Sequence, residues 1–235
     1  GLLMNDAGRH IREQFTDTAG FTDHVFAACA ILGYRFAPRI RDLPSKRLYA
    51  FNPSAAPAHL RALIGGKVNQ AMIERNWPDI LRIAATIAAG TVAPSQILRK
   101  LASYPRQNEL ATALREVGRV ERTLFMIDWI LDAELQRRAQ IGLNKGEAHH
   151  ALKRAISFHR RGEIRDRSAE GQHYRIAGMN LLAAIIIFWN TMKLGEVVAN
   201  QKRDGKLLSP DLLAHVSPLG WEHINLTGEY RWPKP

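Results

Sequence analysis

The sequence predicts an α-rich α/β protein, and three features of its apolar pattern lead to that class. Residues 11–40 alternate between short extended runs and one periodic apolar segment, which is typical of a strand, a helix and a second strand. Residues 53–140 carry apolar side chains at helical spacing throughout. A third long helical pattern covers residues 168–202. The chain therefore combines one small β-α-β unit with a larger number of helices.

The β-α-β unit places an acid where open α/β sheets bind ligands. We expect a strand at 11–16, a turn at Gly20, a helix at 21–32 and a second strand at 34–40. Asp17 then stands at the carboxyl end of the first strand, which is the ligand-binding edge of such sheets. The alternative is a turn aspartate with only a local hydrogen bond. Asp23 is a second acid nearby, and its place just inside the helix favours an electrostatic role there.

The segment after this unit is predicted to be wholly helical. Gly65 and Gly66 break its first helix, and a possible kink near Gly118 interrupts its last. The expected helices cover residues 58–64, 69–89, 94–104 and 108–138. This block separates Asp17 from the acid that follows it.

That acid is Glu147, at the predicted start of another helix. Asn144 and Glu147 have the spacing of a capping box, so the helix is expected to begin after Gly146. An apolar stripe on one side leaves Glu147 with His150 and Arg154 on the other. Glu147 either only closes the capping box, or it holds a divalent metal together with a distant carboxylate, for which Asp17 is the candidate.

The long helix 168–202 is apolar on all sides between residues 181 and 189, so we expect a buried core helix. This apolar run is shorter than a membrane span, and no membrane association is predicted. A short helix at 209–216 and an irregular turn follow. Cys29 is the single cysteine, which excludes an internal disulfide and a Cys-rich zinc site. The histidines 149, 150 and 159 indicate zinc only weakly, because adjacent residues of a helix point about 100° apart.

The charge of the chain is compatible with a nucleic-acid partner. Lys and Arg total 33 against 22 Asp and Glu, the net charge is +11 and the pI is about 10.2. A generally basic surface is the alternative. Arg35, Arg39 and Arg41 alternate with apolar residues, so they face either phosphates or a solvated strand edge. Five arginines at and beyond the end of the Glu147 helix suit either its dipole or phosphate contact.

Five blocks of sequence resemble the C-terminal part of Tn3-family transposases, in the same order along the chain. The first reads TDTAGFTDHVF and the third LNKGEA. The blocks are residues 16–26, 33–43, 143–148, 162–167 and 217–228. Their spread over nearly the whole chain makes the resemblance specific.

The resemblance implies an RNase H-like catalytic core whose Asp-Asp-Glu triad binds Mg²⁺ or Mn²⁺ and drives DNA cleavage and strand transfer. Asp17 matches the second Asp, and Glu147, 130 residues further on, matches the Glu. The implied partners are transposon-end DNA, target DNA and a second protomer, in the bacterial cytoplasm at the nucleoid. The candidate DNA contacts are Arg35, Arg39, Arg41, Lys145, Arg154, Arg161 and Arg165.

Under this resemblance residues 1–52 and 142–235 are two parts of the core, and residues 53–141 are an all-helical insertion. The family's first triad Asp lies far upstream of the second, whereas only Asp6 precedes Asp17 here. We therefore expect an incomplete core that is inactive alone. Two alternatives remain: a remnant that binds only DNA or another protomer, and a metal-independent helical adaptor that would contain no sheet.

Overall fold

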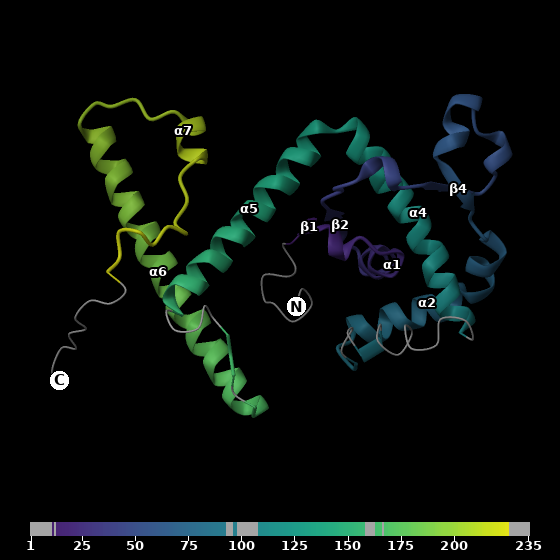
Figure 1. Cartoon of the computed structure of the whole chain (residues 1–235), viewed down its shortest axis with the longest axis horizontal. Helices are drawn as coiled ribbons and strands as arrows, with labels where there is room; N and C mark the ends of the chain where they lie inside the picture. Colours follow the sequence, from purple (N-terminus) through teal and green to yellow (C-terminus); the bar gives the residue numbers. More distant parts are fainter. Residues whose placement is uncertain are drawn as a thin grey trace. The chain divides into compact units, whose positions relative to one another are not determined.

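The computed structural model describes residue 11 and residues 13–92, 96–97, 108–157, 163–165 and 167–225. The chain forms two compact units, residues 1–143 and residues 144–235. Helices dominate both units, and four short strands occur within the described residues of the first (Figure 1). This composition confirms an α-rich α/β protein.

The predicted β-α-β unit is present near the start of the first unit. Strand β1 (Glu13–Thr16) pairs in parallel with β2 (Arg35–Pro38), and helix α1 (Asp23–Ile31) connects them. Gly33 has a φ of 77°, which a residue without a side chain adopts readily, so the chain turns sharply from α1 into β2. Both predicted strands are therefore correct in position, although each is shorter than expected.

Two apolar clusters hold α1 between its neighbours. Helix α4 (Glu109–Leu131) runs past α1 in Figure 1, and the core that they share contains contacts between aromatic rings. Phe26 lies 4.9 Å from Phe36 and 5.5 Å from Phe125, measured between ring centroids. The second cluster joins α1 and α4 to α2 (Gln70–Ala88), whose N-cap is Asn69.

The segment predicted to be wholly helical, residues 53–140, contains one strand, β4 (Ile64–Lys67). It pairs in parallel with β3 (Leu48–Ala50), which lies just before this segment, and residues 58–63 form a 3-10 helix instead of an α-helix. Gly65 and Gly66, which the sequence predicts to break a helix, permit this pairing. A Cβ at Gly65 would stand 2.5 Å from Arg47 Cβ, so only a bare backbone can approach β3 so closely. The predicted helix at 94–104 lies outside the described residues, apart from 96–97.

The predicted start of the Glu147 helix is wrong. Helix α4 ends at Leu131, and α5 runs without interruption from Ala133 to Ile156, so Asn144 and Glu147 lie in its interior. The cap is Asp132, whose carboxylate accepts a hydrogen bond of 3.0 Å from the N–H of Leu135. Leu135 and Ala139 are completely buried in the α1/α4 core. Burial of that face overrides the weak helix propensity of the glycines that follow.

Replacing Asp132 by Ala tests whether this residue caps the start of α5. We expect the free energy of unfolding to fall by about 1 kcal/mol, because the N–H of Leu135 loses its acceptor. Urea unfolding followed by circular dichroism measures the change. Asp132→Asn is the matched control, because Asn caps helices as well as Asp. Equal losses in both variants would show that the carboxylate does not act as a cap.

Gly118 and Gly142 mark close packing positions in the first unit. A Cβ on Gly118 would overlap the backbone carbonyl of Asp23, which brings α4 directly against the first turn of α1. This close contact explains why a glycine is needed at position 118, where the sequence indicated a possible kink. A Cβ on Gly142 would lie 2.7 Å from the ring of Phe15 in β1. Small residues at both points let helices approach the β-α-β unit.

The second unit is built on α6 (Ala169–Arg203), as predicted, with Ser168 as its N-cap. Leu152 and Ile156 from the end of α5 pack on Ala183 and Ile186 of α6. Helix α7 (Pro210–Ala214) starts after Ser209. The irregular segment beyond it is held by Asn190, whose side-chain amide donates to the carbonyls of Pro218 and Gly220 at 2.8 Å.

The apolar centre of α6 is covered on one side only. Ala183 and Ile186 are buried, but Leu181 is 63% exposed and Phe188 is 68% exposed. The expectation of a helix buried on all sides is therefore wrong, because only one face of α6 has neighbours within its unit. By length and composition alone, α6 is also the one helix in the described residues that is able to span a membrane, and 17% of its most apolar window is buried.

Candidate functional site

Asp17 follows β1 directly and is exposed at the carboxyl edge of the parallel pair, as the sequence indicated. Its backbone carbonyl accepts a hydrogen bond of 3.2 Å from the N–H of Gly20, which closes the turn into α1. The N–H of Arg39 donates to the carbonyl of Thr16 at 2.9 Å, so β2 extends alongside the residue before Asp17. Backbone hydrogen bonds therefore fix the position from which the Asp17 side chain projects.

Asp23 has a structural role. Its carboxylate forms an ion pair with Arg122 of α4, with 2.7 Å between Oδ1 and Nη1, and both side chains are only 16% exposed. Arg119 lies 3.9 Å from the other oxygen. Because Asp23 already pairs with two half-buried arginines, Asp17 is the better metal-ligand candidate of the two acids.

Glu147 lies on an exposed side of α5, in the second unit, whereas Asp17 belongs to the first. Lys145 and Arg154 are exposed on the same helix. Burial, followed by the charge of Lys153 and the neighbouring His150, lowers the pKa of His149. The meeting of Asp17 and Glu147 around one metal site stays a prediction. Among the described residues, no three His, Cys, Asp or Glu side chains gather as a metal site.

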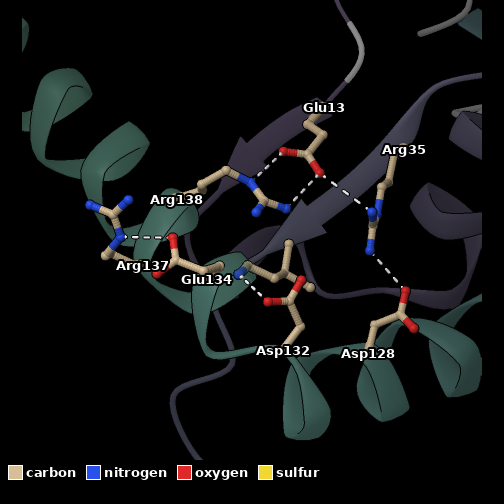
Figure 2. Close-up of polar contacts among 8 residues, drawn as sticks. Glu13, Arg35, Asp128, Asp132, Glu134, Arg137 and Arg138 are labelled. Carbon is tan, nitrogen blue, oxygen red and sulfur yellow. Dashed lines mark hydrogen bonds and ion pairs between the residues drawn. The ribbon is translucent and has the colours of Figure 1, made fainter.

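An ion-pair network joins β1 and β2 to the helices α4 and α5 (Figure 2). Arg138 of α5 donates from Nε and Nη2 to the two carboxylate oxygens of Glu13, at 3.3 Å each. The hydrogen bond to Glu13 raises the pKa of Arg138. Arg35 lies 3.5 Å from Glu13 and 2.8 Å from Asp128. Arg35 is thus engaged within the protein, although the sequence made it a candidate for DNA contact.

The other basic candidates occupy different environments. Arg39 is half-buried and donates to the side-chain carbonyl of Gln140 at 3.5 Å, and Arg41 is exposed. Arg165 pairs with Glu163 at 3.0 Å, with both side chains well exposed. Arg161 lies outside the described residues. Arg41, Lys145 and Arg154 are therefore the candidates with the most open access to a phosphate.

Sequence reasoning missed the residues that brace the site. The pair Glu13 and Arg138 had one local signal, an acid within a short strand, but nothing indicated its distant partner. Arg119 and Arg122 also cover the ring of Tyr49, with the guanidinium carbons 4.6 and 5.1 Å from its centroid. Arg119 and Arg122 thus contribute to the net positive charge of the chain, but their side chains pack against other residues of the protein.

A carboxylate at the carboxyl edge of a parallel strand pair, on a chain with a net charge of +11, is typical of α/β proteins that act on nucleic acids. Comparison of the sequence with known protein families identifies the family. The model of the Tn3 transposase DDE domain matches residues 1–230, and the chain belongs to this family.

Several curated transposases are similar in sequence to this chain along nearly its whole length. It is 55% identical over 99% of its length to the transposase of transposon Tn501 from Pseudomonas aeruginosa, and 54% identical over 98% to that of Tn21 from Escherichia coli. The transposase of transposon gamma-delta from Escherichia coli strain K12 is 36% identical over 100%. The chain spans 24%, 23% and 24% of these three proteins, about a quarter of each.

Proposed function

We propose that this chain supplies part of the catalytic core of a Tn3-family transposase, which cleaves DNA at transposon ends and joins the ends to target DNA. The observation that carries the proposal is Asp17 at the carboxyl end of β1, within a chain that matches the Tn3 transposase DDE domain. In this proposal the β-α-β unit belongs to an RNase H-like core. The protein acts on DNA in the bacterial cytoplasm.

Asp17 and Glu147 are proposed as two of the metal ligands. Both offer the hard carboxylate oxygens that Mg²⁺ and Mn²⁺ prefer, and both are exposed in the structure. Bound metal supplies a Lewis acid that polarises a phosphoryl oxygen and lowers the pKa of water. Lys145 and Arg154, on the same helix as Glu147, are proposed to hold the phosphates of the scissile strand.

A binding role without catalysis is the second candidate. It is favoured by the net charge of +11 and by the exposed side chains of Arg41, Lys145 and Arg154, which suit binding to phosphates. The metal-independent helical adaptor is excluded, because it requires a protein without strands and the structure contains β1 to β4.

A chimaera separates catalysis from binding. The chain would replace the matching segment of the Tn501 transposase, to which it is 55% identical. We expect this hybrid to join transposon ends to target DNA in the presence of Mg²⁺ and to lose joining when the cation is chelated. The unaltered Tn501 protein is the positive control. End binding without joining, in a hybrid whose folding is verified by circular dichroism, would instead establish the binding role.

A further inference from the structure

The segment after α7 returns to the middle of α6 (Figure 1), and an exposed aromatic pair lies where the two meet. The imidazole of His223 stacks on the indole of Trp189, with 5.7 Å between the ring centroids and 16° between the ring planes. Trp189 is 48% exposed, and His223 is exposed as well. Two nearly parallel rings are thus accessible at the surface of the second unit.

Asn190, which is only 4% exposed, fixes the orientation of the His223 ring. Its side-chain amide donates to the carbonyls of Pro218 and Gly220, at 2.8 Å each. The side-chain oxygen of Asn190 lies 2.9 Å from His223 Nε2. Because this oxygen can only accept a hydrogen bond, Nε2 carries the proton, and Nδ1 of the neutral imidazole keeps its lone pair. The ring is therefore held in one orientation and one tautomer before a ligand binds.

The turn that carries His223 is attached to the core of the second unit at both ends. The N–H of Ile224 donates to the carbonyl of Trp221 at 2.8 Å, which closes a tight turn. Trp221 and Ile224 both pack against the apolar cluster that α5 and α6 share. The carboxylate of Glu222 accepts from the N–H of Trp221 at 3.0 Å. The imidazole thus projects from a well-anchored support.

A nucleobase is the ligand that fits this ring pair best. Bases stack on exposed aromatic side chains in proteins that bind single-stranded DNA, because every base has a π-face. The lone pair on Nδ1 of His223 adds an acceptor for an amino group at the edge of a base. A phosphate fits less well, because Nδ1 of the neutral ring has no proton to donate and the same turn carries the carboxylate of Glu222.

We propose that Trp189 and His223 form a stacking site for one unpaired nucleobase of the DNA on which the transposase acts. A base in a duplex is stacked between its neighbours, so it reaches such a site only after it leaves the duplex. The inference rests on the proposed action on DNA, but it does not involve Asp17 or Glu147. Failure of base binding is therefore distinguishable from failure of strand joining by the chimaera.

Binding of a short fluorescein-labelled DNA single strand to the whole chain, followed by fluorescence anisotropy, tests the site. His223→Ala should weaken this binding about tenfold, which is within the range for loss of one stacked base. It should leave binding of the matching duplex unchanged. His223→Phe should restore most of the affinity, because Phe keeps a stacking face. His215→Ala is the matched control and should bind normally, since His215 is also exposed in the second unit, at the end of α7.

Two outcomes of this titration would overturn the proposal. Equal losses for single strand and duplex would show that His223 contacts phosphates, and full binding of the single strand by His223→Ala would show that no base stacks there. Circular dichroism should show the same helix content in all three variants.

A second measurement uses the unsubstituted chain and does not depend on the folding of a variant. Long-range ¹H–¹⁵N correlation spectra should show His223 as the Nε2–H tautomer, and addition of the unlabelled single strand should shift its ring resonances upfield. The Nδ1–H tautomer, or ring resonances that stay unchanged when the single strand is saturating, would contradict the proposed site.

Discussion

Asp17→Asn should abolish joining of transposon ends by the Tn501 chimaera, with a loss of about 10³-fold or more, and Glu147→Gln should do the same. Each substitution removes a negative charge and one metal-ligand oxygen but keeps the size of the side chain. A loss of this size corresponds to about 4 kcal/mol of transition-state stabilisation, which is within the range that a bound metal contributes. The measurement is the rate of strand joining with Mg²⁺ at a fixed concentration of hybrid.

Asp23→Asn is the matched control for Asp17→Asn. Asp23 lies six residues away, and it pairs with the half-buried Arg122. Its substitution should lower stability, because Arg122 loses its partner, while joining by the folded hybrid persists. Binding of transposon ends should survive in all three variants. Joining retained in Asp17→Asn or Glu147→Gln would remove that residue from the proposed mechanism.

Gly118→Ala should cause the largest loss of stability, about 3 kcal/mol, because the added methyl group overlaps the backbone carbonyl of Asp23. Backbone atoms at a packed helix crossing cannot rotate away as a flexible side chain does. Helix α4 would have to move off α1, and the contacts of Phe125 with Phe26 would loosen with it. Urea unfolding followed by circular dichroism measures the loss.

The control for Gly118→Ala is the same substitution at Gly146, in the interior of α5. Nothing lies within 4 Å of the Cβ that would be added there. Ala is the better helix former, so Gly146→Ala should stabilise the chain by about 1 kcal/mol. Opposite signs at the two positions would establish that packing, and not helix propensity, sets the requirement at Gly118. Destabilisation of equal size at both would contradict this explanation.

Local pattern was sufficient for the β-α-β unit, α2, α6 and α7. In each case a capping residue or a glycine stands at an element boundary, such as Ser168 before α6 and Gly33 after α1. The local pattern was misleading where the same residues are compatible with two different structures. Gly65 and Gly66 break a helix, but they also permit close pairing of strands, and only the presence of β3 decides between these.

The family, the α-rich α/β class and the place of Asp17 at the end of a strand were all predictable from the sequence, because these depend on motifs and on neighbouring residues. Three features appear only in the folded chain: the start of α5 at Ala133, the ion pairs of Asp23 and Arg35, and the uncovered face of α6. Each of these depends on side chains far apart in the chain. Burial and charge pairing are properties of such contacts, and a linear pattern does not contain them.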